Sequence, residues 1–342
     1  MAAVARRSGT VRQAGQHASG QPASPWAGLR SRFLEARSTA DQLHIFDLTA
    51  RTAQDLHRWA ARYPLIRRVR VWPLALSVAA AAPFSSVEAL ITTARLSLWV
   101  FTLDDLFDEE RVPQAELVRR TERYRAIAHG QSVSTAGDSL SAALYEVVDD
   151  LASYALFPSL GQAWIDALCG TIEGMTGEYQ WRLRYRRDGE AMLPSTDEYL
   201  ATGLYSIGVP PHVWATLITI GDPSTPQHVE HLRSMEQIAS TCIRLANDLQ
   251  SFPKEVTEGK INALVILGRA LQQQGLAEQA AHRQAEARVR AEIAEGLDRL
   301  AALQAAAGTQ SRRPEAAIAD IARFVCDFYG EHDYHTFVAQ RS

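Results

Sequence analysis

The stretch NDLQSFPKE, residues 247–255, is the segment on which the interpretation of this chain depends. On a helix, Asn247, Ser251 and Glu255 stand four residues apart and therefore share one face. Their side-chain oxygens are of the kind that binds hard cations such as Mg²⁺. The same polar row would also suit a helix end that binds no metal. The rest of the sequence has to decide between these two interpretations.

Pro253 stands inside this row, between the second and third candidate ligands. A proline in a helix interior lacks the backbone N–H and clashes with the carbonyl four residues earlier, here that of Leu249. The sequence therefore predicts a kink or a wide turn between Leu249 and Pro253. Because such a turn would rotate Glu255 relative to Asn247 and Ser251, Glu255 is the candidate ligand that depends most on the local backbone.

Composition places the chain among ordinary globular proteins. It has 342 residues, of which 46% are hydrophobic and 22% charged, and its net charge is −4. This balance, without any DNA- or RNA-binding motif, argues against nucleic acid as a partner. The most apolar run, residues 71–84, is broken by Pro73 and is too short to span a bilayer, so no membrane is expected.

Three widely spaced cysteines, Cys169, Cys242 and Cys326, form no C-x-x-C pair. They predict neither a disulfide framework nor a zinc cluster, which favours a cytoplasmic location. The first 25 residues are rich in Ala, Ser, Gly, Gln and Arg and contain no acid. This composition predicts a disordered N-terminal tail over residues 1–25.

From residue 26 to residue 342, apolar residues recur at helical spacing, and Gly or Pro stands between the periodic segments. Strand-like alternation is nearly absent, and no linker is long enough to separate two domains. The sequence therefore predicts one all-α domain over residues 26–342. The expected helices cover residues 41–63, 85–108, 112–129, 138–154, 161–187, 195–206, 210–220, 225–256, 258–274, 277–306 and 313–337.

A second acidic cluster lies upstream in WVFTLDDLFDEE, residues 99–110. Asp104 and Asp108 share a helix face, and Asp105 lies about 100° around the helix. Carboxylates crowded in this way repel one another, and divalent cations relieve the repulsion. Alone, the pattern is more typical of a solvated acidic helix end. The apolar segment before it, residues 89–103, favours a buried helix and hence a metal site.

Positive charge stands beside the downstream stretch. Arg244 is three residues before Asn247 and lies on nearly the same face, and Lys254 lies within the stretch itself. Cations next to a metal site suit a multiply charged anion, and diphosphate is the natural candidate.

The two motifs together, D-D-x-x-D at residues 104–108 and N-D-x-x-S-x-x-K-E at residues 247–255, resemble those of the class I terpene synthase family, bacterial type. The resemblance implies a single-domain α-helical barrel with the motifs facing each other across its mouth. It also implies three Mg²⁺ ions, with Mn²⁺ as a substitute, that hold the diphosphate of a prenyl diphosphate. The metal ligands that it implies are Asp104, Asp108, Asn247, Ser251 and Glu255; Asp105 joins Asp104 and the three downstream residues in the catalytic set, and Arg244 and Lys254 contact diphosphate.

The implied reaction is release of diphosphate, which leaves an allylic carbocation to cyclise or rearrange into an olefin or alcohol. Such a cation needs an apolar pocket with aromatic faces turned towards it. The candidate pocket residues are Trp99, Phe101, Tyr179, Trp181, Tyr205, Ser206, Gly208 and Trp214; for each aromatic one, ordinary core packing is an equal alternative. Tyr329, Asp333 and Tyr334 belong to an aromatic and acidic segment, residues 328–337, that resembles the C-terminal caps of the family.

The substrate is indicated by the break in DEYLATGLYSIGVPP, residues 197–211. Its S-I-G element, Ser206 to Gly208, resembles the helix break of labdane-related class I diterpene synthases, which favours geranylgeranyl diphosphate or a bicyclic C20 diphosphate. The arginine that many bacterial members carry just before this break is missing. Arg182, Arg184, Arg186 and Arg187 are the candidates to replace it.

Several alternatives stay open. The substrate could be farnesyl diphosphate, as for a sesquiterpene synthase. A chain-elongating prenyltransferase shares the first motif but needs a second aspartate-rich motif, and a non-catalytic helical scaffold would leave the two ligand sets unexplained. No D-x-D-D motif occurs, so a bicyclic substrate would require a separate class II cyclase. A homodimer stays open as well.

Overall fold

The computed structural model describes residues 31–109, 112–189, 193–306 and 308–334, and these ranges hold helices and turns without a strand. The all-α prediction is therefore confirmed. These residues belong to one compact unit, Ser31–Phe337. The predicted tail, residues 1–25, lies outside the described residues. The helices are α1 (Arg32–Glu35), α2 (Thr39–Ala60), η1 (Arg68–Arg70), α3 (Val71–Ala81), α4 (Val87–Asp108), α5 (Gln114–Ala128), α6 (Ser139–Ala152), α7 (Phe157–Asp188), α8 (Thr196–Ser206), α9 (Val209–Ile220), η3 (Thr225–His228), α10 (Val229–Glu258), α11 (Ala263–Gln273), α12 (Glu278–Ala305) and α13 (Arg313–Glu331).

Helix α3 is missing from the sequence-based prediction. All of its residues except Trp72 are buried, so it has no polar stripe from which a helical period could be recognised. Pro73 stands in its first turn, where the absent N–H would have no helical partner in any case. The proline that interrupts the apolar run of residues 71–84 is therefore compatible with a helix.

Helix α4 carries the first acidic motif through the centre of the unit. It begins at the N-cap Ser86, whose hydroxyl accepts the backbone N–H of Ala89. It packs against α2, α3, α6, α7 and α9, so most of its sides are buried. In its last turns, Asp104 and Asp108 are partly exposed, whereas Asp105 is buried. The apolar character of residues 89–103 thus reflects burial, as the sequence indicated.

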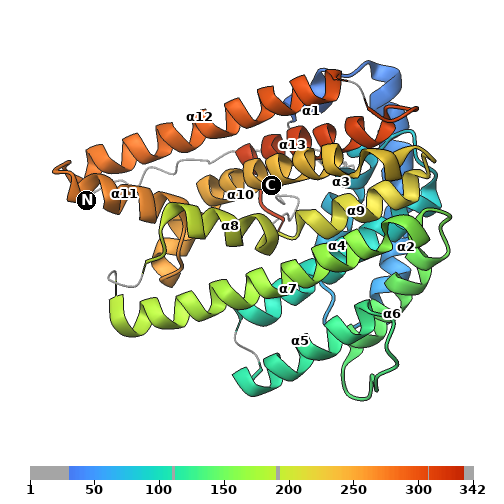
Figure 1. Ribbon diagram of the computed structural model, residues 1–342, viewed down its shortest axis with the longest axis horizontal. Coiled ribbons are helices and arrows are strands. Elements are labelled where there is room, and N and C mark those ends of the chain that lie inside the picture. The colour runs from blue at the N-terminus through green and yellow to red at the C-terminus, as the bar shows by residue number, and fades with distance from the viewer. Residues whose placement is uncertain (1–30, 110–111, 190–192, 307, 335–342) are drawn as a thin grey trace, which may run out of the picture. The chain divides into compact units, whose positions relative to one another are not determined.

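Helices α8 and α9 lie end to end between α7 and α10 (Figure 1). Between them the chain turns at Gly208, which has a φ of 76°. A side chain there would be strained by this φ, and its Cβ would lie 2.4 Å from Val100 Cγ1 of α4. The helix break predicted from the S-I-G element is present, and glycine is required by both backbone and packing.

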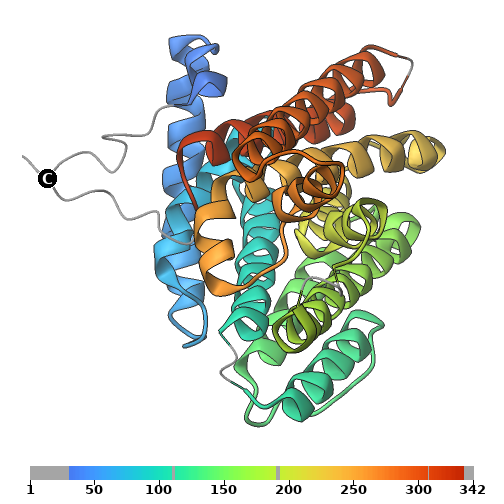
Figure 2. The same cartoon turned by 90° about the vertical axis from the view of Figure 1, so that its left-hand side faces the viewer.

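The second motif lies on α10, which packs against α12 and α13 on one side and against α8 and α9 on another. In Figures 1 and 2, α12 and α13 (orange to red) lie on the opposite side of the bundle from α5. None of the described helices combines the length and apolarity needed to cross a membrane.

Candidate active site

The two motifs line one pocket. Asp104 and Asp108 enter it from the end of α4, and Asn247, Ser251 and Glu255 enter it from α10. The segments are far apart in the sequence, and the packing of the bundle brings them to a common mouth. The further walls come from α7, α8, the residues after α10 and the segment after α13.

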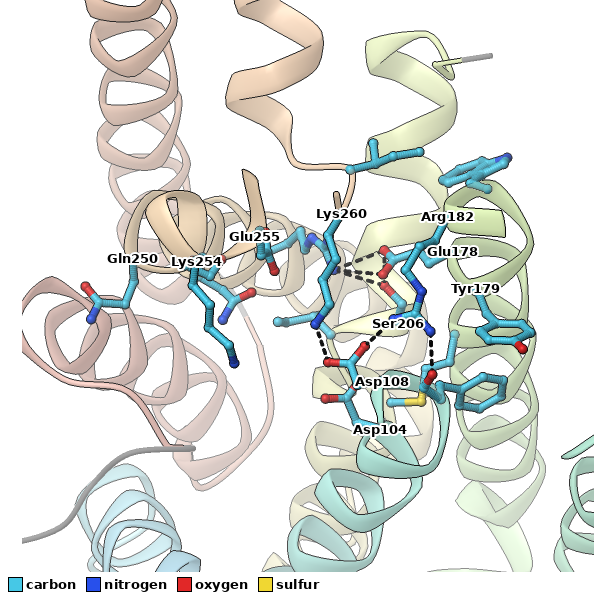
Figure 3. A pocket seen from close by; sticks show the side chains of 18 of the residues that line it. Asp104, Asp108, Glu178, Tyr179, Arg182, Ser206, Gln250, Lys254, Glu255 and Lys260 are labelled. Atoms are coloured by element: carbon cyan, nitrogen blue, oxygen red, sulfur yellow. Dashed lines mark hydrogen bonds and ion pairs between the residues drawn. The ribbon is translucent and has the colours of Figure 1, made fainter. Parts of the chain in front are cut away.

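The carboxylates of Asp104 and Asp108 lie in a setting that disfavours negative charge. Burial, and then the neighbouring Asp108 carboxylate, raise the pKa of Asp104 well above its usual range. Asp108 is held by two cations: Arg182 Nη1 lies 3.1 Å from Oδ1 and Lys260 Nζ lies 2.7 Å from Oδ2. Figure 3 shows the two side chains converging on this carboxylate. More positive charge, from a metal ion, would therefore stabilise the ionised form of Asp104.

Asp105 has a different position from the one expected of a catalytic residue. Its carboxylate receives two hydrogen bonds from Arg70, at 2.7 and 2.8 Å, and pairs with Arg67 at 3.3 Å. It does not line the pocket. Because Asp105 lies about 100° around α4 from Asp104, its side chain faces η1. We therefore correct its assignment from catalysis to holding α4 in place.

Helix α10 continues through Pro253, so of the kink or wide turn predicted before this proline, the wide turn is wrong. Glu255 consequently stays in the pocket with Asn247 and Ser251. Its carboxylate accepts a hydrogen bond from Asn262 Nδ2 at 2.8 Å, and burial raises its pKa. The hydroxyl of Ser251 donates to the backbone carbonyl of Asn247 at 2.8 Å, which leaves its lone pairs available as ligands.

Arg244 and Lys254 both line the pocket but differ in environment. Arg244 is buried, with Glu178 at 3.0 Å, Asp248 at 3.1 Å and the hydroxyl of Tyr199 at 3.0 Å. This network fixes the guanidinium on the inner wall. Lys254 is exposed, and its Nζ lies 3.9 Å from Glu258. Of the two predicted diphosphate contacts, Arg244 is therefore the one already held in position.

Two cations of the site were not singled out from the sequence. Lys260 follows the end of α10 at Gly259, whose φ of 66° turns the chain back over the pocket. Burial opposes its charge, but pairing with Asp108 and Glu258 raises its pKa. Arg182 was one of four equivalent arginine candidates. Arg182 and Lys260 line the pocket, whereas Arg184, Arg186 and Arg187 do not.

The candidate pocket residues divide into two groups. Trp99, Tyr205 and Trp214 line neither of the two cavities described here: Trp99 and Trp214 pack in the core, and Tyr205 is half-buried against Gly170 of α7. Trp99, for example, donates to the carbonyl of Leu140. The candidates that do line the pocket are Phe101, Tyr179, Trp181 and Ser206, and Gly208 lines a second cavity.

This second cavity adjoins the pocket and is apolar. The two share the wall residues Val100, Phe101, Ile207 and Tyr329. Every other side chain that lines the second cavity is uncharged as well, apart from the titratable His212. The segment after α13 contributes to both spaces: Asp333 lines the pocket and Tyr334 lines the second cavity. The site thus has a charged mouth and an apolar interior.

No three Asp, Glu, His or Cys side chains in the described part of the chain come together as a metal site by themselves. The expected ligand set agrees with this, because Asn247 and Ser251 are neutral and the carboxylates come from two separate helices. Such a set needs additional oxygen ligands from water or from an anion, as Mg²⁺ commonly uses.

Comparison with known proteins gives a consistent result. The model of terpene synthase family 2, C-terminal metal binding, matches residues 95–295. An ent-isokaur-15-ene synthase of Oryza sativa subsp. indica is 26% identical over 231 residues, and a chloroplastic kaurene synthase like 2 of Isodon rubescens is 29% identical over 201 residues. The matches cover 62% and 55% of this chain but only 27% and 25% of those relatives. The chain thus spans about a quarter of their length.

Solved structures share the fold. A 2-methylisoborneol synthase from Streptomyces coelicolor A3(2), in complex with Mg²⁺ and geranyl-S-thiolodiphosphate, superposes with a TM-score of 0.67 and 16% identity over 84% of this chain and 90% of that one. A linalool/nerolidol synthase from Streptomyces clavuligerus, in complex with 2-fluorogeranyl diphosphate, gives a TM-score of 0.63 and 17% identity over 82% and 94%.

Proposed function

Because the chain belongs to the class I terpene synthase family, whose metal-binding model matches residues 95–295, we propose that it ionises a prenyl diphosphate with the help of divalent cations. One observation carries the proposal. Asp104 and Asp108 of α4 and Asn247, Ser251 and Glu255 of α10 line a single pocket with a charged mouth. A solvated acidic helix end or a helical scaffold would not bring these two sets together.

The residues present fit Mg²⁺. Burial and the neighbouring Asp108 carboxylate disfavour the ionised form of Asp104, which a divalent cation would stabilise, and the donors are all oxygens. We assign Asp104 and Asp108 to one side of the metal site and Asn247, Ser251 and Glu255 to the other. Three ions, the number implied by the family, are part of the proposal. When bound, Mg²⁺ stabilises negative charge on the departing diphosphate as a Lewis acid.

The chain's own cations act on the same anion. Arg244 is fixed on the inner wall, and Arg182 and Lys260 lie at the mouth beside Asp108. We infer that these side chains orient the diphosphate and stabilise the charge that develops as the carbon–oxygen bond breaks. The electron pair of that bond leaves with the diphosphate, and an allylic carbocation stays behind. Lys254 supplies a further, exposed contact at the rim.

The carbocation then reacts in the apolar cavity. Phe101 stands at the boundary between the mouth and this cavity, and Tyr179 and Trp181 line the mouth. Their ring faces attract positive charge, and the apolar walls exclude water that would quench the cation early. Cyclisation or rearrangement to an olefin or alcohol follows.

We propose a C20 substrate, either geranylgeranyl diphosphate or a bicyclic labdane-type diphosphate supplied by a separate class II cyclase. The S-I-G break supports this choice, because Gly208 fits closely against Val100 and Ile207 forms part of the wall shared by both cavities. The kaurene-type synthases among the sequence relatives support it as well. Farnesyl diphosphate is the alternative substrate that the test below includes.

The test is to incubate the purified chain and Mg²⁺ with C10, C15, C20 and bicyclic C20 diphosphates and to analyse the products by mass spectrometry. We expect conversion of a C20 diphosphate with release of diphosphate. In Asp104→Asn the turnover should fall by at least about a hundredfold while the circular dichroism spectrum is kept. Asp47→Asn, on the exposed face of α2, is the control and should keep its activity. If none of these substrates is consumed, the proposed function is wrong.

A further inference from the structure

A serine–histidine pair forms part of the wall of the apolar cavity. Ser97 of α4 and His212 of α9 both line it, and Ser97 Oγ lies 2.9 Å from His212 Nδ1. Of the described residues that line this cavity, only His212 carries a side-chain nitrogen. The functions assigned so far to the pocket do not use this pair.

The hydrogen-bond pattern favours one tautomer of His212. The hydroxyl of Ser97 lies 3.0 Å from the carbonyl of Thr93, to which it can donate its single hydrogen. With the hydrogen placed there, the oxygen of Ser97 accepts from His212 Nδ1–H, and this tautomer has its lone pair on Nε2. Burial lowers the pKa of His212 to about 4, which keeps the ring neutral near pH 7.

The position of the pair suits a reaction on the hydrocarbon part of a substrate. Ser97 precedes Asp104 by seven residues on α4, which corresponds to about 10 Å along the helix axis. The metal-binding end of α4 and the imidazole therefore lie at different depths of the site. An imidazole at this depth meets interior carbons of the chain and stands away from the diphosphate.

We propose that His212 is the catalytic base that ends the carbocation reaction, an inference that rests on the proposed function. Nε2 takes a proton from a carbon next to the cationic centre. The electron pair of the broken C–H bond becomes the second bond of a carbon–carbon double bond, and the ring becomes an imidazolium. After the olefin leaves, the imidazolium releases the proton to water, so atoms and charge balance without an oxidant or reductant.

The rival oxygen atoms of the cavity are weaker acceptors. Ser77 donates to the carbonyl of Pro73, and its oxygen lies 2.6 Å from the hydroxyl of Tyr334. These hydroxyls are already engaged with each other, and a hydroxyl oxygen is a poorer base than a neutral imidazole. A low-pKa imidazole is still adequate, because a hydrogen beside a carbocation is far more acidic than an imidazolium.

The experiment compares His212→Phe with Ile243→Val, which trims one methyl group from the same cavity wall and leaves the base intact. Both diphosphate release and product composition are measured with the substrate that the wild type consumes. In His212→Phe we expect the share of the parent olefin to fall by about tenfold or more, in favour of other olefins and water-quenched alcohols, and diphosphate release to fall much less. Ile243→Val should keep the parent olefin as its main product.

His212→Asn is the second variant, in case His212→Phe does not fold. Its amide is small and not basic, so His212→Asn should show the same loss of the parent olefin. The proposal is wrong if either His212 variant makes the parent olefin in its original share, or if Ile243→Val shifts the products as strongly. Failure of the proposed function would look different, because the wild type would then release no diphosphate from any prenyl diphosphate.

Discussion

Lys260 donates a hydrogen bond to Asp108 at 2.7 Å and thereby joins two segments that are 152 residues apart. Arg182 contacts the other oxygen of the same carboxylate. Asp108 thus shares its charge between two cations, and a metal ion that binds Asp108 has to compete with both.

Replacing Lys260 by methionine should strengthen metal binding to the substrate-free protein. The Lys260–Asp108 pair is partly exposed, so it contributes about 1 kcal/mol. Mn²⁺ does not have to displace this pair in the variant, and its affinity should therefore be about fivefold higher. Titration followed by electron paramagnetic resonance measures this. Lys254→Met, which changes an exposed lysine paired at 3.9 Å with Glu258, is the matched control and should leave the affinity as it is. Weaker Mn²⁺ binding in Lys260→Met would contradict the competition.

Replacing Asp105 by asparagine should destabilise the fold. Its partner Arg70 is only 1% exposed, and removal of one member of a buried pair leaves an uncompensated charge that costs about 3–5 kcal/mol. Urea denaturation measures the free energy of unfolding. Asp104→Asn is the comparison, because it removes an unpaired, crowded carboxylate and should leave stability equal or higher. A stable Asp105→Asn variant without activity would restore Asp105 to the catalytic set.

Replacing Gly208 by alanine should destabilise the chain by about 1–3 kcal/mol, because the new Cβ meets Val100 and the φ of 76° is strained for alanine. The double variant with Val100→Ala should recover the steric part of this loss and keep the backbone part. Gly268→Ala is the control: a Cβ added at that position of α11 would have no neighbouring atom within 4 Å, so the change should stabilise by about 0.5–1 kcal/mol. Thermal melting compares all three. If alanine changed the stability equally at Gly208 and at Gly268, the helix break would not require glycine.

Glu236 should make stability fall as pH rises. Burial raises the pKa of this carboxyl to about 7, against the hydrogen bond from Ser240 and the charge of Arg233, which lower it. Between pH 4.5, its ordinary pKa, and about pH 7, the unfolded chain loses the proton that the folded chain keeps, so unfolding becomes easier over this window. Glu236→Gln should therefore be more stable than wild type by roughly 2–3 kcal/mol at pH 8 and similar to it near pH 4.5.

Denaturation at several pH values checks the prediction for Glu236. Glu230→Gln, on the exposed part of the same helix, is the control and should follow the wild type throughout. If Glu236→Gln were more stable than the wild type by the same amount at every pH, the effect would come from packing and not from ionisation of Glu236.

The two ligand sets could be predicted from the sequence because their spacing is a local property of a helix. Asp104 and Asp108, like Asn247 and Ser251, share a face on any α-helix, whatever surrounds it. The partners of these residues are tertiary. Lys260 reaches Asp108 only because α10 ends at Gly259 and the chain turns back, and no local pattern reports that contact.

The errors have the same origin. Asp105 belongs to the motif by position, yet Arg70, 35 residues earlier, decides what it does. Helix α3 was missed because burial on nearly all sides removes the alternation of polar and apolar residues on which helix prediction depends. At Pro253 the local rule predicted a kink or a wide turn, but α10 stays helical because its packing on α12 and α13 outweighs the loss of one backbone hydrogen bond.

The hydrogen-bonded contact between Ser77 and Tyr334 spans 257 residues and forms part of the wall of the apolar cavity. A growing chain that has left the ribosome as far as α12 already carries both ligand motifs, but it still lacks Tyr329 and Tyr334. Helix α13 packs against α3, α9, α10 and α12, so the wall to which Tyr329 and Tyr334 belong is complete only after the part of the chain beyond α12 has been made. Under the proposed function, the residues that would hold metal and diphosphate are thus synthesised before the wall that would keep water from the carbocation.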